Sequence, residues 1–455
     1  MNRRIAGMAA AVGAAAWLLG GGAVWAQVVY PADMFRGGPA HTGAYDSPPV
    51  PVVKAQLWRF KAQDKIVSSP AVSGGWVYFG DVGGTIWGVD GRTGQEMWRV
   101  RTGGDICSSP AVVGGVVYVG SDDRNLYAIA SRTGLEQWRL KTGGKVRSSP
   151  AVAGGTVYFG SDDKTLYAVD AASGTERFRV RFRGAVRASP AVAGGMVYAG
   201  DTDGLFVAAD AALGTVRWTF KVRKGFSGSP CVADDVVYVG DEAGDLYALD
   251  AATGQQKGLF KTDGPIETSP AFSAGILYIG SNDRYLYAID VGAAQIRWRF
   301  RAEQAVRSSP VVAGGMIWFG SDDGHLYALD AATGEQKWRF RSGKPIEASA
   351  AVAGGVVYVA GTDKQVYALS AVEPSPLVPL PPAMAPPAGT PTGPAPGAPS
   401  PSLAPGPAGP PAAPVPPPVP GPTLPPTPAP PPLPTPAPSS PPPPPPVPPP
   451  AAAPL

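Results

Sequence analysis

The sequence predicts an all-β protein: an eight-bladed β-propeller of four-stranded antiparallel blades, with its ring closed by an N-terminal strand and followed by a disordered Pro-rich tail. Three observations support this prediction: a 40-residue period, four strand signals in each period, and a number of repeats that closes a ring. The period is kept from Trp58 to Tyr358 without insertion or deletion. A Ser-Pro dipeptide marks it, with prolines at Pro70, Pro110, Pro150, Pro190, Pro230, Pro270 and Pro310, and with Ala350 in the eighth position.

The seventh repeat shows the predicted strands, which are 308–313, 316–320, 325–329 and 337–341. Glycine and aspartate in the intervening turns can adopt the conformations that tight turns require. In the fourth strand Trp338 and Phe340 alternate with Arg339 and Arg341, so the two pairs face opposite sides of the sheet. We expect the aromatic pair to pack between blades. The arginines should face solvent and keep the exposed strand edge from pairing with other chains.

The two ends of the repeat array complete each other. The last repeat ends at Leu369, before its fourth strand, because the prolines that begin at Pro374 cannot join a sheet. A strand with the fourth-strand pattern, which contains Trp58, precedes the first repeat. The sequence therefore predicts a propeller over 56–371, in which this N-terminal strand completes the last blade and removes the free edge of the ring.

Residues 1–26 have the pattern of a secretory signal peptide. Arg3 and Arg4 precede an apolar stretch, and Val24 and Ala26 are the small residues of a cleavage site after Ala26. An uncleaved membrane anchor is the alternative. We expect an exported protein of the periplasm, cell envelope or extracellular space, with no integral membrane segment once the signal is cleaved. Residues 27–55 are then a lead-in segment before the propeller.

Residues 372–455 are predicted to form a disordered polyproline II tail. From Pro374 to Leu455, 41 of 82 residues are proline and none is Asp, Glu, Lys or Arg. A segment of this composition cannot bury enough apolar surface to offset the entropy lost on ordering. Proline-rich chains adopt an extended polyproline II conformation instead.

A family resemblance rests on the turn and outer strand of the repeat. The pattern Ala-x-Asp-x-x-Thr-Gly-x-x-x-Trp, present at Ala328, Asp330, Thr333, Gly334 and Trp338, resembles the tryptophan-docking repeat of the quinoprotein-like propellers, which carry PQQ-like repeats. This family includes pyrroloquinoline quinone (PQQ) dehydrogenases and the propeller component of the bacterial outer-membrane barrel-assembly machinery, BamB. The segment MFRGGPAHTG at 34–43 looks like the Phe-Arg-Gly lead-in of such propellers.

The resemblance implies structural docking by one aromatic residue in each outer strand. These residues are Trp58, Trp98, Trp138, Phe178, Trp218, Trp298 and Trp338. Gly258 removes the aromatic in one outer strand, and Ala294 replaces the glycine of one turn. The blade that ends with the Gly258 strand should therefore have the loosest outer contact.

The sequence predicts no catalytic residue, no bound cofactor and no metal site. The dehydrogenases of the family carry a vicinal cysteine pair, a calcium site and a catalytic aspartate in long insertions, whereas Cys107 and Cys231 lie three repeats apart and no repeat contains an insertion. We interpret both cysteines as buried small apolar residues. His41 and His325 are the only histidines, so no Ser/His/Asp or Cys/His set can be assembled. The recurring aspartate pairs are interpreted as hairpin turns.

Charge balance excludes another class of partner. Without Arg3 and Arg4 the chain has 36 basic and 35 acidic residues, so it lacks the basic surface that nucleic-acid binding requires. We expect a monomer that binds protein partners in the envelope.

One position varies among repeats in which the scaffold residues hold constant. It lies three residues before each Ser-Pro proline and contains Val67, Cys107, Arg147, Arg187, Ser227, Glu267, Arg307 and Glu347. Since it precedes the first strand, these side chains should encircle one mouth of the central channel. We predict that the charged members Arg147, Arg187, Glu267, Arg307 and Glu347 bind a partner, because rigid scaffolds place function at loop ends. Arg147 and Arg187 could each grip a carboxylate with a planar fork. Random drift at an exposed position is the alternative.

The favoured hypothesis is an exported, non-catalytic propeller that acts as a protein-interaction scaffold in the bacterial cell envelope, with outer-membrane protein assembly as the process that the resemblance suggests. A PQQ-dependent dehydrogenase, or a degenerate relative of one, is the first alternative. The second is a cell-wall-associated structural protein that acts through its Pro-rich tail.

Overall fold

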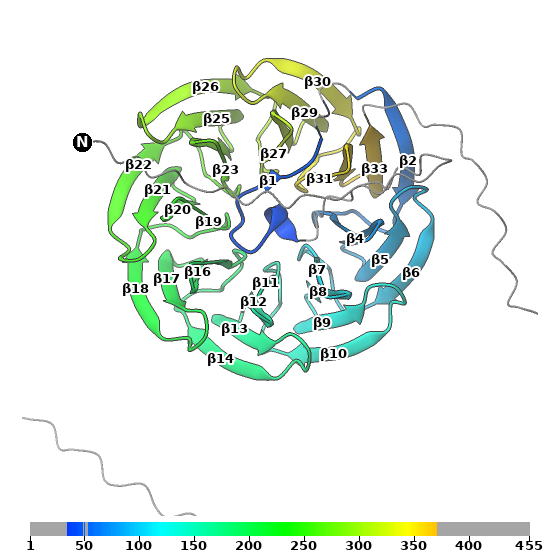
Figure 1. Cartoon of the computed structure of the whole chain (residues 1–455), viewed down its shortest axis with the longest axis horizontal. Coiled ribbons are helices and arrows are strands. Elements are labelled where there is room, and N and C mark those ends of the chain that lie inside the picture. The colour runs from blue at the N-terminus through cyan, green and yellow to red at the C-terminus, as the bar shows by residue number, and fades with distance from the viewer. Residues whose placement is uncertain (1–33, 49, 51–52, 371–455) are drawn as a thin grey trace, which may run out of the picture. The chain divides into compact units, whose positions relative to one another are not determined.

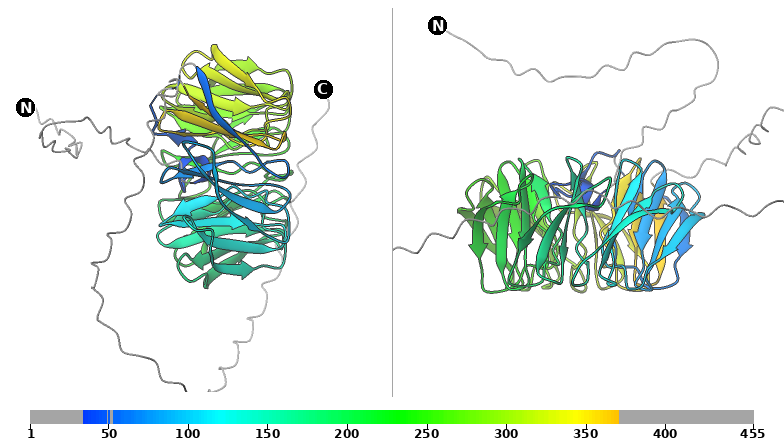
Figure 2. Two further views of the ribbon diagram at one scale, coloured as in Figure 1. Left: turned by 90° about the vertical axis from the view of Figure 1, so that its right-hand side faces the viewer. Right: turned by 90° about the horizontal axis from the view of Figure 1, so that it is seen from below.

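Eight four-strand blades surround a central channel in this computed structural model, which describes residues 34–48, 50 and 53–370 (Figure 1). Seen from the side, the blades form one flat disc (Figure 2). The predicted signal peptide and Pro-rich tail lie outside the described residues. Within the described part no helix is long and apolar enough to cross a membrane.

The first four blades are continuous in sequence, and each runs from its inner to its outer strand. Blade 1 contains β3 (Ala71–Ser73), β4 (Trp76–Gly80), β5 (Thr85–Asp90) and β6 (Glu96–Arg101). Blade 2 contains β7 (Ala111–Val113), β8 (Val116–Gly120), β9 (Asn125–Ala130) and β10 (Glu136–Lys141). Blade 3 contains β11 (Ala151–Ala153), β12 (Thr156–Ser161), β13 (Thr165–Asp170) and β14 (Glu176–Arg181). Blade 4 contains β15 (Ala191–Ala193), β16 (Met196–Gly200), β17 (Leu205–Asp210) and β18 (Val216–Lys221).

The remaining blades follow the same order, except that the last one takes its outer strand from the N-terminal side. Blade 5 contains β19 (Cys231–Ala233), β20 (Val236–Gly240), β21 (Asp245–Asp250) and β22 (Gln256–Lys261). Blade 6 contains β23 (Ala271–Ser273), β24 (Ile276–Gly280), β25 (Tyr285–Asp290) and β26 (Gln295–Arg301). Blade 7 contains β27 (Val311–Ala313), β28 (Met316–Gly320), β29 (His325–Asp330) and β30 (Gln336–Arg341). Blade 8 contains β31 (Ala351–Ala353), β32 (Val356–Ala360), β33 (Gln365–Ser370) and β2 (Ala55–Lys61).

Ring closure takes the predicted form. Strand β2 pairs antiparallel with β33, placing Trp58 opposite Ala368 and Lys61 opposite Gln365. Blade 8 thus contains three strands from the C-terminal side of the propeller and one from the N-terminal side, as the repeat count predicts. Closure removes the free edge that an open array of blades would expose.

The inner strands are shorter than the sequence predicts. The first strand of the seventh repeat spans Val311–Ala313 and not 308–313. Pro310 has no N–H to give to a ladder. The preceding serine, Ser309, is hydrogen-bonded to a neighbouring blade, because its hydroxyl accepts from the backbone N–H of Ser269.

A ring of serines joins the inner ends of the blades. At seven junctions the backbone N–H of one such serine donates to the hydroxyl of the equivalent serine in the next blade, at 2.9–3.0 Å. The bond from Ser349 N to Ser69 Oγ, 2.9 Å, connects blade 8 to blade 1. These serines are buried, so each bond satisfies a backbone group that water cannot reach.

Aromatic docking joins the outer parts of the blades. Indole N–H groups donate to a backbone carbonyl of the next blade in the pairs Trp58–Gly91, Trp98–Ser131, Trp138–Ala171, Trp218–Ala251 and Trp298–Ala331, at 2.7–3.1 Å. A tyrosine from the second strand donates to the same carbonyl, as Tyr118 does to that of Ala171. The indole also lies against a turn glycine of the next blade, since a Cβ on Gly94 would be 2.7 Å from Trp58 Cδ2.

Two departures from this pattern occupy one junction, between blades 5 and 6. Each docking aromatic lies 36 residues before the turn glycine that it contacts. At this spacing Ala294 occupies the turn position that a residue at 258 would contact. Around Gly258 a Cβ would have only the Ala248 Cβ within 4 Å, at 3.5 Å. Because no indole covers the turn, it tolerates the Cβ of Ala294, which has φ 52°. The outer strand of blade 5 therefore contributes no docking indole, and the loosest outer contact at this blade stays a prediction.

We predict that Ser149→Ala lowers the free energy of unfolding by about 1–3 kcal/mol, because the buried N–H of Ser109 loses its acceptor. Urea unfolding followed by tryptophan fluorescence measures the change. Ser73→Ala, whose half-buried hydroxyl has no hydrogen bond within the described residues, is the control and should unfold within about 0.5 kcal/mol of the parent. Equal stability of the two variants would show that the serine ring contributes nothing.

We predict that Gly258→Trp is stabilising only together with Ala294→Gly. The new indole would meet the Ala294 Cβ, whereas the other matched turns within the described residues present a glycine to the ring. A double-mutant cycle in urea should give a favourable coupling of about 1 kcal/mol or more. If the changes in unfolding free energy of the two single variants simply add up in the double variant, positions 258 and 294 do not contact each other as proposed.

Candidate functional site

The lead-in segment fills the channel toward one face of the disc. It contains the 3-10 turn η1 (Phe35–Gly37) and the strand β1 (Ala44–Tyr45), which pairs parallel with β27 and becomes a fifth strand of that sheet. Inner strands of blades 4 to 7 donate to its carbonyls in the pairs Val192–Pro39, Val232–Ala40, Phe272–Thr42 and Val312–Gly43. In Figure 1 this segment lies at the centre of the ring. It thereby ties half of the blades together from inside.

Two ionisable residues of the lead-in are buried at the channel centre. The guanidinium of Arg36 donates to the carbonyls of Pro310, at 3.0 Å, and Pro270. Burial lowers the pKa of Arg36 to about 10, which still leaves it charged at neutral pH. Burial, together with the charge of Arg36, lowers the pKa of His41 to about 3, so His41 is neutral. The sequence analysis assigned neither residue a role, although the Phe-Arg-Gly motif marks the segment.

The predicted mouth residues lie at the other face, where the inner strands begin. Arg147 forms a bidentate pair with Asp122, with Nε to Oδ1 at 2.9 Å and Nη2 to Oδ2 at 2.7 Å. Arg187 forms the equivalent pair with Asp162, at 2.9 and 3.2 Å. The two forks that the sequence suggested for a partner's carboxylate are thus already engaged within the chain.

Blades 5 to 8 form a second arc of the mouth. Arg307 lies 3.6 Å from Glu267 and 3.3 Å from Asp322. The amide of Asn282 donates to Glu267 at 2.9 Å, and Ser227 donates to Glu242 at 2.6 Å. Glu347 is half-buried and has no hydrogen bond or ion pair within the described residues.

Sequence analysis missed the carboxylates that stand between the predicted residues. The turn residues Asp122, Asp162, Glu242 and Asp322 come 15 positions after Cys107, Arg147, Ser227 and Arg307, and the fold inserts them between neighbouring mouth residues. The three aspartates were interpreted as turn formers alone, and Glu242 was given no role. The 15-residue offset can be seen in the sequence. Which mouth residue each carboxylate contacts depends on how neighbouring blades are spaced around the ring.

The two arcs therefore differ in charge. In the first, Asp122, Arg147, Asp162 and Arg187 alternate and neutralise one another. The second arc contains Glu242, Glu267, Arg307, Asp322 and Glu347, four acids and one base. Two further acids, Glu242 and Asp322, thus join the predicted mouth residues Glu267, Arg307 and Glu347 in this arc.

The pKa values of two mouth carboxylates, Asp122 and Asp322, reflect these contacts. Burial raises the pKa of Asp122, but hydrogen bonds from Arg147 and Lys145 outweigh burial, so its pKa lies below the ordinary value. Burial raises the pKa of Asp322 above its ordinary value, because the opposing effect of Arg307 is reduced by nearby Glu267.

The remaining candidate residues have structural contacts. They are the two cysteines, His325 and the aspartates of the turns. Cys231 is buried as expected, whereas Cys107 is only half-buried, and both are free thiols. His325 is packed against Asp323, with Nδ1 and Oδ1 3.1 Å apart. Turn carboxylates are hydrogen-bonded locally, as Asp123 is to the N–H of Gly103 at 2.9 Å.

The residues present do not fit the quinone and calcium site of the family's dehydrogenases. Cys107 and Cys231 lie in different parts of the ring and cannot form a vicinal pair. Among the described residues no group of three or more His, Cys, Asp or Glu side chains is placed to hold a metal ion. The three arginines of the mouth, Arg147, Arg187 and Arg307, are instead paired with carboxylates of the chain.

Comparison with known proteins identifies relatives at the level of family and fold. A family model described as outer membrane protein assembly factor BamB matches residues 54–149, 127–259 and 256–373. No curated protein sequence matches the chain.

Solved structures with the same fold include BamB and two dehydrogenases. BamB from Moraxella catarrhalis is 20% identical, with a TM-score of 0.62 over 70% of this chain and 100% of that chain. A europium-containing methanol dehydrogenase is 14% identical, with a TM-score of 0.64 over 72% of this chain and 89% of that one. The quinohemoprotein alcohol dehydrogenase from Pseudomonas putida HK5 is 15% identical, with a TM-score of 0.67 over 78% and 83% of the respective chains. Likeness at these identities shows the fold alone.

We predict that Arg147→Ala lowers the free energy of unfolding at neutral pH by about 1–3 kcal/mol, because the Asp122 side chain, only 6% exposed, loses its bidentate partner. The pKa of Asp122 is lowered in the folded state. Its stabilising contribution is therefore complete above the unfolded value of about 4 and is lost as pH falls through the folded value.

Urea unfolding at a series of pH values measures this effect. The difference between parent and Arg147→Ala should be largest at neutral pH and shrink in acid. Glu347→Gln is the control, since Glu347 has no hydrogen bond or ion pair to lose within the described residues and should change stability by less than about 0.5 kcal/mol. A difference that is independent of pH would contradict the assigned role of Asp122.

Proposed function

The chain belongs to the family described as outer membrane protein assembly factor BamB, and from this membership we propose that it is an exported, non-catalytic protein-interaction scaffold of the bacterial cell envelope. The process we assign to it is outer-membrane protein assembly. One observation carries the proposal: the family match runs from residue 54 to residue 373 and so spans the whole ring. The exported location is part of the same proposal and agrees with the signal-peptide pattern at residues 1–26.

The mouth supports a binding role because the charge of its side chains differs from blade to blade while the blades themselves stay the same. Eight blades of one length present residues of different charge at one position. We propose that Arg147, Arg187, Glu267, Arg307 and Glu347, with the carboxylates between them, form the partner-binding surface. The arc over blades 5 to 8 has an excess of carboxylates and favours a basic segment of the partner.

A quinone-dependent dehydrogenase is the second candidate, favoured by the fold of the two dehydrogenases described above. The fold hosts both kinds of protein, so the choice depends on the site. The lack of fit between the described residues and a quinone and calcium site argues for the scaffold.

We predict that a photocrosslinking amino acid at position 347 or 187 captures an outer-membrane assembly protein in living cells. Position 101, on the outer rim, is the matched control and should capture little of it. Position 347 is well suited because Glu347 is not engaged by a described neighbour. Equal capture at positions 347 and 101 would contradict the mouth as the partner surface.

We also predict that purified protein mixed with PQQ and calcium shows neither dye-linked alcohol oxidation nor a rise in melting temperature. A ligand that binds the native state raises its stability by mass action, so a scanning-fluorimetry titration detects binding without relying on turnover. A saturable rise with both ligands present would support the dehydrogenase and overturn the scaffold.

A further inference from the structure

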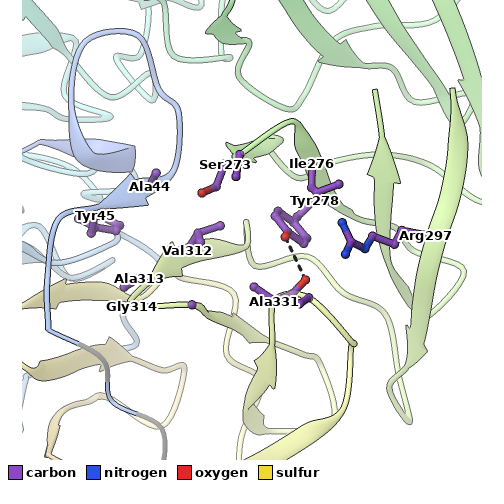
Figure 3. A pocket seen from close by; sticks show the side chains of 13 residues that line it. Ala44, Tyr45, Ser273, Ile276, Tyr278, Arg297, Val312, Ala313, Gly314 and Ala331 are labelled. Atoms are coloured by element: carbon purple, nitrogen blue, oxygen red, sulfur yellow. Dashed lines mark hydrogen bonds between the residues drawn. The ribbon is translucent and has the colours of Figure 1, made fainter. Parts of the chain in front are cut away.

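A pocket opens between blades 6 and 7, on the face where the lead-in leaves the channel. Its volume is about 300 Å³. Tyr278 and Ile276 from blade 6 form one wall, Val312 and Ala331 from blade 7 form another, and Tyr45 of the lead-in lies at the inner end (Figure 3). The hydroxyl of Tyr278 donates to the Ala331 carbonyl at 3.1 Å, which leaves the aromatic ring as an apolar wall.

Arg297 is the only cation that lines this pocket. Figure 3 shows its guanidinium beside the ring of Tyr278. Within the described residues this guanidinium has no hydrogen bond and no ion pair, although it comes from an outer strand whose equivalents are engaged. The four other cations at this position are engaged in the pairs Arg177–Asp170, Arg217–Asp210, Lys257–Asp250 and Lys337–Glu335, at 2.6–2.8 Å.

An equivalent pocket between blades 3 and 4 provides an internal comparison. Its volume is about 430 Å³, and Tyr158 and Arg177 replace Tyr278 and Arg297. There the guanidinium donates to Thr156 at 2.7 Å and to Asp170 at 2.6 Å. The position of Thr156 is taken by Ile276 in the pocket of blade 6, which offers no acceptor.

The turn of blade 6 explains why the second acceptor is missing as well. In blade 3, Asp170 Oδ1 accepts the N–H groups of Ala172 and Ser173, and Oδ2 faces Arg177. In blade 6 the strand β26 begins one residue early, so Asp290 pairs with Gln295 in the ladder. Asp290 keeps one turn bond, from Ala293 N, and does not reach the cation.

This change of turn lies at the junction that lacks a docking indole. Ala294 can replace the turn glycine because Gly258 leaves the turn uncovered. Loss of one indole from blade 5 thus occurs at the same junction as the reshaped turn and the unengaged arginine of blade 6. The other described turns keep both the glycine and the ion pair where a cation is present.

We propose that this pocket binds an acidic segment of a partner protein, with a carboxylate on Arg297 and a neighbouring aliphatic side chain between Ile276 and Val312. The inference rests on the proposed scaffold function and adds the chemistry of a second contact. Charge complementarity selects this occupant, because an unengaged guanidinium presents a planar fork that matches a carboxylate. The apolar walls accept the flanking side chain beside the exposed guanidinium.

Methyl NMR of the purified full-length chain tests the proposal. The probe is a capped peptide of sequence Gly-Ser-Leu-Glu-Leu-Ser-Gly, and its matched control has Gln in place of Glu. The Glu peptide should shift the methyl signals of Ile276 and Val312 in a saturable manner. Val192, which takes the place of Val312 in the pocket between blades 3 and 4, should not shift.

Variants assign the interaction to the guanidinium. Arg297→Ala and the Gln peptide should each weaken binding by about tenfold or more, since either removes the charge-assisted pair. Arg177→Ala is the matched control and should bind like the parent. Ile276→Thr restores the acceptor found in the other pocket and should weaken binding while the melting temperature is kept.

Three results would overturn the proposal: no shift of the Ile276 methyl at about 5 mM peptide, a millimolar limit for weak contacts; equal affinity for the Gln peptide; or unchanged binding by Arg297→Ala. The measurement uses purified protein and a synthetic probe, so a failure here leaves crosslinking at the mouth unaffected. Conversely, absence of crosslinks would remove the scaffold function even if the peptide bound.

Discussion

A single hydrogen bond, from the backbone N–H of one serine to the hydroxyl of the next, sets the geometry on which the ring depends. It joins the inner ends of adjacent blades at 2.9–3.0 Å in the buried wall of the channel. The bond requires that each blade present its serine at the same height and distance from the axis. Repeats of one length meet this requirement, and an insertion before Ser149 would break the two such bonds that it forms.

Aromatic docking works at the rim as the serines do at the centre, and together the two layers fix the angle between blades. The rim tolerates variation that the centre does not. One junction has lost the indole, at Gly258, while its serine bond from Ser229 to Ser269 is kept. The structural consequence is confined to the neighbouring turn and to Arg297, because blades contact each other through many independent pairs.

The two faces of the disc have different chemistry. The lead-in occupies one end of the channel and buries Arg36 and His41 there, so this end is a packed interior. At the opposite end, ion pairs link neighbouring blades and leave an excess of carboxylates over blades 5 to 8. A scaffold with two such faces can hold a basic segment on one and an acidic segment on the other.

The sequence by itself determined the number of blades, the strand order, the closing strand and the docking aromatics, because all of these follow from a period that is read along the chain. It also identified the mouth position, whose eight residues share one phase. Only the tertiary structure decided which charges meet. Arg147 lies 25 residues from Asp122, and Arg297 is separated from its counterparts by whole blades. Whether a guanidinium forms an ion pair depends on the contacts between neighbouring blades and on the shape of one turn. The 40-residue period of the sequence does not show either of these.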